Sequence, residues 1–398
     1  MKFNKLALSA AIALSIAAPL AQAEGAPLIA PELGKITFDT RLRYEDVNDD
    51  SAAKDAEALT LRVRLGYLTP DFAGFKVFAE VESTTPLGGR DYKNGTGHGA
   101  GYSVIADPDN NELNRGWISY SGFDNTQIKL GRQRIILDNA RFVGNVGWRQ
   151  NEQTYDALTV VNTSLQDTQI VVGYVDNVKT ILGTNVEAGV PVINVKYSGL
   201  PFGDISAYGY FIDYDDSTVA DRDTIGLRFN GSSAVSDSVK VLYTAEYAQQ
   251  EIDRAAASDE DLDYYLIEGG LSFAGITAKI SHEVQEGNNG ASFKTPLGTN
   301  HAFNGWADQF LATPGDGLED TFLTLSTTVA GVKLAAVYHE FEAEDSSIDY
   351  GDELDFVAVK KINKNYKVLV KYATYNRGDA ASKKSDKDKF WVQAEMTF

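Results

Sequence analysis

Cysteine is absent from the 398 residues of the chain, and methionine and histidine are rare, with two and four residues. Without cysteine the chain can form neither a disulfide framework nor a thiolate metal site. The four histidines share no motif, and the sequence contains neither a GxSxG nucleophile motif nor a GxxxxGK[ST] nucleotide loop. We therefore predict that the protein is not an enzyme and has no catalytic residues, no metal site and no cofactor.

Long hydrophobic runs are also missing, since no segment approaches the ~18–20 apolar residues that a transmembrane helix needs. The first residues, MKFNKLALSAAIALSIAAPLAQA, begin with lysines, continue with a short apolar run and end on Ala-Gln-Ala. This pattern is typical of a secretory signal peptide. We expect residues 1–23 to be removed on export and residues 24–398 to fold as one domain.

The composition favours a membrane barrel. The chain has 35 Gly, 20 Tyr and 19 Phe against 10 Pro, and its net charge is -20. An exported protein can be this polar and still lie in a membrane if alternate residues face lipid and water, as they do in transmembrane β-barrels. Acidic runs in the predicted outer loops account for much of the net charge.

Apolar residues occupy every second position in several segments. In the last one, FWVQAEMTF, Phe390, Val392 and Met396 fall on one face, whereas Gln393 and Glu395 fall on the other. Nine residues with period two are about the length of one tilted transmembrane strand. A secreted β-sandwich also alternates, but its strands are usually shorter, and no fixed-period repeat supports a β-solenoid.

The same alternation predicts an all-β fold, a transmembrane antiparallel β-barrel of about 18 strands, with 16 as the alternative. Short links such as TPDFAG and SGFDN alternate with long links, as expected for periplasmic turns and outer loops. The expected strands cover 36–45, 59–67, 75–82, 114–121, 126–133, 156–162, 168–176, 191–198, 204–212, 222–230, 237–248, 262–272, 275–284, 318–329, 332–342, 352–363, 365–375 and 388–398.

The inward faces of the early strands are rich in arginine. If the apolar faces meet lipid, Arg41 and Arg43 on one strand and Arg62 and Arg64 on the next point into the lumen. Arginine stays charged and its planar fork matches a carboxylate, so an inward cluster would attract anionic solutes. The alternative is that these arginines only pair with acids. The predicted pore-lining residues are Arg41, Arg43, Arg62, Arg64, Arg115, Lys129, Arg134, Arg141, Arg149, Asp39, Glu80 and Glu82, and the last three, with Glu45, are candidates to face the arginines across the pore.

Two long links are the candidates to narrow the pore. Residues 134–155 and 84–113 lie nearest the arginine-bearing strands, and either could fold inward. Arg134, Arg141 and Arg149 belong to the first of these loops. Arg132 shares the phase of Leu130, which points it towards lipid unless the strand bends at the intervening glycine.

The stretch GRQRIILDNARFVGNVGWRQNEQTYDAL, residues 131–158, resembles a segment shared by the alginate-export family of proteobacterial outer-membrane porins. The resemblance implies an eighteen-stranded, monomeric barrel with an arginine-rich lumen suited to uronate polymers such as alginate, or to other anions. The residues that carry the likeness to a positively charged pore are Arg41, Arg43, Arg62, Arg64, Arg132, Arg134, Arg141 and Arg149.

We therefore expect a porin in the outer membrane of a Gram-negative cell that lets small hydrophilic, mostly anionic solutes diffuse, such as sugar acids or uronate oligomers. The alternatives are a general or weakly selective porin and a non-transport barrel acting as an enzyme or adhesin. The expected partners are outer-membrane lipid and lipopolysaccharide, small anionic solutes, and the barrel-assembly machinery through the last strand, which ends in Phe398. Nucleic acid is not expected, because no basic face remains outside the lumen.

Overall fold

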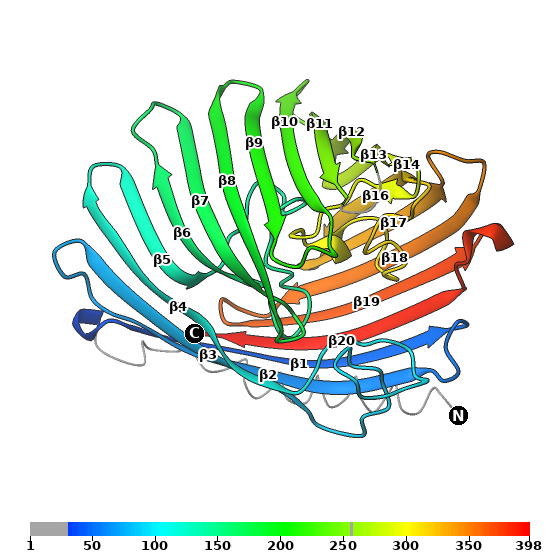
Figure 1. Cartoon of the computed structure of the whole chain (residues 1–398), viewed down its shortest axis with the longest axis horizontal. Helices are drawn as coiled ribbons and strands as arrows, with labels where there is room; N and C mark the ends of the chain where they lie inside the picture. Colours follow the sequence, from blue (N-terminus) through cyan, green and yellow to red (C-terminus); the bar gives the residue numbers. More distant parts are fainter. Residues whose placement is uncertain (1–30, 255–257) are drawn as a thin grey trace.

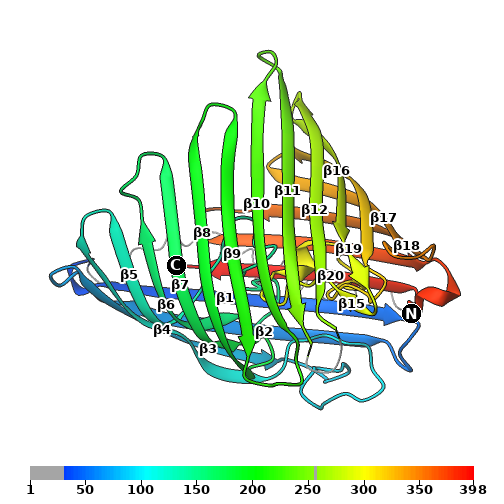
Figure 2. The same cartoon turned by 45° about the horizontal axis from the view of Figure 1, so that its top comes forward.

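Eighteen strands of the chain form one closed antiparallel sheet (Figure 1). The computed structural model describes residues 31–254 and 258–398, so the predicted signal peptide lies outside the described residues. Each strand pairs with its neighbours along the chain, and β1 pairs with β20 to close the ring, so the blue and red strands lie side by side in Figure 1 and Figure 2. The predicted barrel is confirmed with 18 strands rather than 16.

The strands of the barrel are β1 (Lys35–Asp49), β2 (Ala56–Leu68), β3 (Phe75–Pro86), β4 (Asn110–Phe123), β5 (Thr126–Gln133), β6 (Thr154–Asn162), β7 (Thr168–Lys179), β8 (Asn185–Leu200), β9 (Gly203–Tyr214), β10 (Asp221–Ala234), β11 (Val239–Asp253), β12 (Glu260–Phe273), β13 (Ile276–Gln285), β16 (Leu318–Val329), β17 (Val332–Glu342), β18 (Asp349–Lys361), β19 (Tyr366–Arg377) and β20 (Lys387–Thr397). A separate hairpin joins β14 (Gly287–Asn288) to β15 (Ala291–Ser292), and the 3₁₀ helices are η1 (Pro31–Leu33), η2 (Asn300–Ala302) and η3 (Ala380–Ser382). None of the helices in the described part of the chain is long and apolar enough to cross a membrane.

Side chains alternate between the two faces of the sheet, as the sequence predicts. On β3, Val77 and Val81 are exposed on the outer face, whereas Glu80 and Glu82 are buried on the inner face. Because successive side chains of a strand point to opposite faces, a strand with this pattern can present apolar groups to lipid and polar groups to the lumen. The period of two therefore fixes which charges line the interior.

Several strands are longer than the sequence suggests at the end with the long loops. The link expected over 177–190 is wrong for most of its length, because β8 begins at Asn185 and continues its pairing with β7. Residues 185–190 alternate, but Ala188 and Val190 on their apolar face are buried inside the barrel instead of facing outward. Their pattern therefore lacks the outward apolar face of a transmembrane strand, yet the backbone pairing with β7 extends through them.

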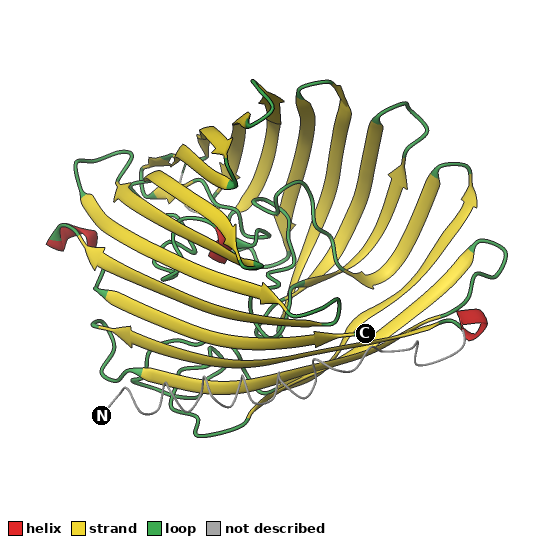
Figure 3. Cartoon of the chain, turned by 180° about the vertical axis from the view of Figure 1, so that it is seen from behind, coloured by secondary structure: helices red, strands yellow, loops and turns green. Residues whose placement is uncertain are grey.

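Two of the long loops fold into the barrel. We call residues 134–153 the first lumenal loop and residues 286–317 the second lumenal loop. Figure 3 shows loops and the short helix η2 of the second lumenal loop lying inside the ring of strands. The two loops join through backbone hydrogen bonds from the N–H of Gly144 to the carbonyl oxygen of Leu297 and from the N–H of Thr299 to that of Ala140, both 2.9 Å.

Apolar side chains of the loops pack against the inner wall and hold the loops across the lumen. The ring centroid of Phe142 in the first lumenal loop lies 5.0 Å from that of Tyr208 on β9, in a tilted arrangement, and 5.3 Å from that of Tyr264 on β12, edge to face. Phe310 of the second lumenal loop lies 4.5 Å from Phe341 on β17. Buried aromatic contacts therefore anchor the loops to β9, β12 and β17.

Candidate functional site

Arg41 and Arg43 of β1 point into the lumen and hold the first lumenal loop. Nη1 of Arg41 lies 3.0 Å from each of the carbonyl oxygens of Gly147, Trp148 and Arg149. Nη2 of Arg43 donates to the Trp148 carbonyl at 2.5 Å, and its guanidinium lies 4.1 Å from the indole ring centroid of the same residue. Both arginines are buried, so they bind the loop's backbone rather than face open water.

Arg62 and Arg64 of β2 continue this surface, and we call Arg41, Arg43, Arg62 and Arg64 the arginine wall. Nη1 of Arg62 and Nη2 of Arg64 lie 3.4 and 3.5 Å from the carbonyl oxygen of Gln150. The Gln150 side chain in turn donates to the hydroxyl of Thr60 at 2.8 Å. The arginine wall thus fastens the backbone of residues 147–150 to the barrel, and direct contact of these four arginines with a solute stays a prediction.

The acids that the sequence offered as facing partners lie beside the arginines instead of across the pore. Asp39 pairs with Arg62, and Glu82 pairs with Arg64. Glu80 binds Arg115 in two hydrogen bonds of 2.8 and 2.7 Å. The reason is the pairing of β1 with β2, β2 with β3 and β3 with β4, which brings their inward residues into adjacent positions.

Glu152 neutralises two arginines from within the first lumenal loop. Its carboxylate accepts from Arg134 at 2.5 and 2.6 Å and lies 3.5 Å from Nη1 of Arg64. Burial acts to raise the pKa of Glu152, but Arg64 and Arg134 outweigh it and hold the pKa well below its ordinary value. Glu152 is therefore ionised across the physiological range.

Arg149 is the second arginine of this loop that the structure pairs with acids. It binds Glu45 of β1 and lies 3.5 Å from Asp107, which also caps the N–H of Gln150 at 2.8 Å. Burial acts to lower the pKa of Arg149, but Asp107 and Glu45 overcome it and raise the pKa above the ordinary value. Loop 87–109, the other candidate for folding inward, thus reaches the arginine wall through Asp107.

Arg141 reaches the far side of the barrel. Its Nε lies 2.8 Å from Oε1 of Glu283 on β13, and its Nη2 lies 2.9 Å from the side-chain oxygen of Asn304 in the second lumenal loop. The residue is 1% exposed. Arg141 therefore connects the two lumenal loops to β13.

Arg132 lies outside the lumenal cluster. It shares the face of Leu130, which is exposed on the outer surface, and binds Asp156 in two hydrogen bonds of 2.8 and 2.7 Å. The alternation of side chains between the two faces of β5 therefore continues through Gly131, although φ at this glycine is +115°. This placement agrees with the direction expected from the alternation.

A cluster of acids on β13, β16 and β18 lies on the inner wall against the second lumenal loop, and its members are not among the residues predicted from the sequence. The N–H of Ala307 donates to Glu353 at 2.7 Å, and the N–H of Trp306 donates to Asp355 at 3.1 Å. Gly305 permits this close approach, because a Cβ at this position would collide with the Glu353 carboxylate. The alternation of Glu353 and Asp355 with apolar residues in DELDF is the signal that marks them as inward. The members of the cluster are Glu283, Asp320, Glu353 and Asp355.

Three partly exposed lumenal cations, Lys129, Arg222 and Lys294, have no carboxylate partner among the described residues. Nζ of Lys129 on β5 lies 4.8 Å from the ring centroid of Trp117. Arg222 on β10 donates to the side-chain oxygen of Gln250 at 3.0 Å, and the same oxygen accepts from the backbone N–H of Lys294 at 3.0 Å. Burial and the neighbouring Arg222 lower the pKa of Lys294. All three cations are partly exposed.

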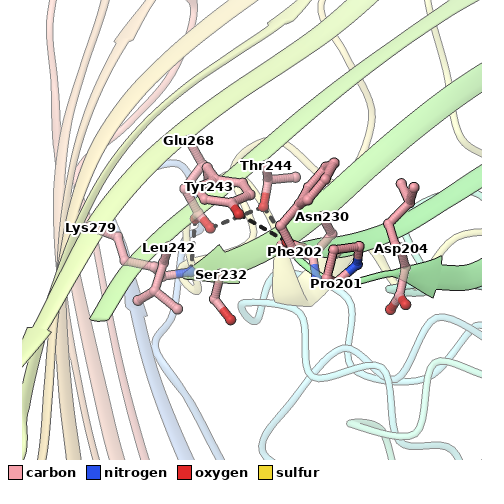
Figure 4. A pocket seen from close by; sticks show the side chains of 13 residues that line it. Pro201, Phe202, Asp204, Asn230, Ser232, Leu242, Tyr243, Thr244, Glu268 and Lys279 are labelled. Carbon is pink, nitrogen blue, oxygen red and sulfur yellow. Dashed lines mark hydrogen bonds and ion pairs between the residues drawn. The ribbon is translucent and has the colours of Figure 1, made fainter. Parts of the chain in front are cut away.

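Hollows lie on both sides of the loops. On the long-loop side, a cavity of about 420 Å³ has Trp148, Arg149 and His301 in its lining, and a neighbouring cavity of about 660 Å³ shares Gln153, Thr180 and Pro296 with it. Near the short turns, a cavity of about 410 Å³ opens on the inner wall between β8 and β13. Figure 4 shows its polar lining, in which Glu268 lies between Lys279 and Thr244.

Neither a family model nor a curated protein sequence matches the chain. Solved structures do match its fold. OccAB3 from Acinetobacter baumannii has a TM-score of 0.72 at 13% identity, and the match covers 91% of this chain and 98% of that one. OccK9 from Pseudomonas aeruginosa has a TM-score of 0.71 at 12% identity, with the same coverage.

A third similar structure is that of OpdK from Pseudomonas aeruginosa with vanillate, with a TM-score of 0.70 at 14% identity over 91% of this chain and 98% of that one. OpdK is an outer membrane protein. The chain therefore has the fold of a Gram-negative outer-membrane β-barrel. The resemblance to the alginate-export family stays a prediction.

Proposed function

We propose that the protein is a passive channel of the outer membrane for small hydrophilic solutes, with a preference for anions. The closed barrel supports a channel because its lumen is charged and contains hollows on both sides of the lumenal loops. A barrel of 16–18 strands is wide enough to leave an aqueous passage. Loops that cross such a lumen would restrict the passage to small solutes.

The observation that carries the preference for anions is the set of three partly exposed cations without a carboxylate partner, Lys129, Arg222 and Lys294. The arginine wall contributes less, because acids and loop carbonyls already satisfy it. The lumenal acids Glu353 and Asp355 do not attract passing cations as the three partly exposed cations attract anions, because both carboxylates are fully buried under the second lumenal loop. A passing anion could therefore bind these three cations without displacing a carboxylate.

Organic acids are the solutes that we propose. The similar outer-membrane protein OpdK has been solved with vanillate, an organic anion, and the sequence segment around Arg141 and Arg149 resembles a family whose name refers to alginate, a uronate polymer. Sugar acids and uronate oligomers combine a carboxylate with hydroxyl groups. The polar inner wall near Glu268 and Thr244 suits such hydroxyl groups.

Uptake into liposomes tests this function with solutes of similar size. Proteoliposomes that contain the folded barrel should take up glucuronate faster than glucose, because only glucuronate is attracted by the unpaired cations. Equal rates would instead favour a general or weakly selective porin. A folded barrel that admits neither solute would overturn the channel function and favour a non-transport barrel.

A further inference from the structure

Lys371 is a lysine on the inner face of β19 that is only 5% exposed. Its neighbours along the strand, Val370 and Tyr372, are exposed on the outer face, so the alternation directs the Lys371 side chain into the lumen. A buried ammonium group is costly unless other groups replace its water. The groups that surround Lys371 therefore matter to the arrangement of the interior.

The ammonium group of Lys371 is held by the two lumenal loops. Nζ lies 2.7 Å from Nε2 of His301 and 3.7 Å from the ring centroid of Trp306, both in the second lumenal loop. It also lies 4.2 Å from the ring centroid of Trp148 in the first lumenal loop. None of the carboxylates in the described ranges lies within ion-pair distance of Nζ. The lone pair of His301 Nε2 and the ring faces of Trp148 and Trp306 thus take the place of water around the ammonium group.

The hydrogen bonds of His301 assign its protons. Nδ1 lies 2.5 Å from Oδ1 of Asp308, so Nδ1 carries hydrogen and donates to the carboxylate. Nε2 is then free to accept from Lys371. Oδ2 of Asp308 accepts from Nζ of Lys389 on β20 at 2.5 Å. The chain of contacts from Lys371 through His301 and Asp308 to Lys389 ties the second lumenal loop to two adjacent strands.

Trp148 links this chain to the first lumenal loop. The His301 ring stacks on the Trp148 indole with 4.6 Å between the ring centroids and an angle of 7° between the planes. The guanidinium of Arg43 also lies against this indole. Trp148 and His301 line the 420 Å³ cavity on the long-loop side. The contacts around Lys371 therefore lie where the two loops meet, and two of the residues that it contacts line that cavity.

We propose that Lys371 is a positioning residue that clamps both lumenal loops and so sets the width of the passage. The clamp joins β19 to Trp148 of one loop and to His301 and Trp306 of the other. Without the ammonium group, His301 loses a donor and the two indoles lose the cation between them. The loops then lose a shared attachment to this wall, although the arginine wall still holds the first of them. This inference rests on the proposed channel function.

The test is single-channel recording in planar bilayers with Lys371→Met, which keeps most of the side-chain length but removes the charge. We expect the conductance to rise by about 1.5- to 2-fold with frequent transitions between current levels, because the narrowest section limits a pore. Lys371→Arg, which keeps a cation between the rings, should restore a current close to that of the unchanged protein. A purely structural role in folding would not produce this difference in a folded barrel.

Lys279→Met is the matched control. Lys279 is also a lumenal lysine, but it pairs with Glu268 at 2.8 Å on the wall of the cavity near the short turns, so its removal should leave the current transitions unchanged. Trp306→Leu supplies a second variant if Lys371→Met does not fold, with an increase in the same direction. Native conductance in a folded Lys371→Met or Trp306→Leu barrel would overturn the clamp, whereas absence of conductance in the unchanged protein would overturn the channel function itself.

Discussion

Arg43 of β1 donates a hydrogen bond to the carbonyl oxygen of Trp148 at 2.5 Å while its guanidinium lies over the indole of the same residue. One side chain of the barrel wall thus holds both the backbone and the ring of a loop residue more than a hundred positions away. Arg41 likewise donates hydrogen bonds to three carbonyl groups of the loop. These two positively charged side chains therefore hold the loop against the barrel wall. Positive charge that serves this purpose is not available to a solute.

Arg43→Met should loosen the first lumenal loop. Removing one partner from a buried, hydrogen-bonded charge network costs about 3–5 kcal/mol in the free energy of unfolding, and here the loss falls on the contact with Trp148. We expect trypsin to cleave after Arg149 in the folded variant. Arg228→Met is the control, because Arg228 pairs with Glu246 on the wall and touches neither loop. Continued protection of Arg149 in Arg43→Met would contradict the fastening role.

Glu152→Gln should increase the preference for anions. Glu152 is ionised because Arg64 and Arg134 hold its pKa well below the ordinary value despite burial, so the substitution removes a full negative charge from the lumen. Arg134, which is partly exposed, then lacks its carboxylate partner. Reversal potentials in a salt gradient should shift in the anion-selective direction, whereas Asp237→Asn in a short turn should not shift them. An unchanged potential in Glu152→Gln would show that Arg134 does not face the passage.

His301 should make the free energy of unfolding depend on pH. Burial lowers the pKa of His301 well below its ordinary value of 6.5, and Lys371 acts in the same direction, while Asp308 opposes them. Below about pH 6.5 the unfolded chain binds a proton at this residue but the folded chain does not, so its contribution to stability is complete above that pH and is lost as the pH falls.

Urea unfolding at pH 7.5 and pH 5.5 measures this contribution. The loss on acidification should be smaller in His301→Gln than in the unchanged protein, by at most about 1.4 kcal/mol per pH unit for one proton. His98→Gln is the control, since His98 lies exposed in loop 87–109. Equal losses in the unchanged protein and His301→Gln would mean that His301 is protonated in the folded barrel.

The sequence predicts the barrel well because one physical rule governs it. Lipid on one side and water on the other impose a period of two, which is visible in short stretches such as Phe75 to Glu82 and which assigns the inward faces of Arg41 and Arg62 correctly. The links between strands are also visible in the sequence, because they contain turn residues such as Gly, Pro and Asn. These two signals predict an antiparallel barrel of about 18 strands with 16 as the alternative, and the structure has 18.

The interior is harder to predict because it depends on contacts that leave no pattern in the sequence. Carbonyl groups of residues 147–150 bind the arginine wall, and any residue has such a group. The partners of Arg141 and Lys371 lie more than sixty residues away and become neighbours only when the loops enter the lumen. Glu353 and Asp355 did show the inward phase, but only the closure of the ring, in which β20 pairs with β1, brings β18 within three strands of Arg41 and Arg43.

The zero-current potential in a salt gradient across a planar bilayer is the most direct test of the proposed anion preference. The unchanged protein should give a potential with the sign of an anion-selective pore, and the triple variant Lys129→Met, Arg222→Met and Lys294→Met should bring that potential close to zero while the barrel stays folded. A cation-selective potential in the unchanged protein, or full anion selectivity in the triple variant, would contradict the account.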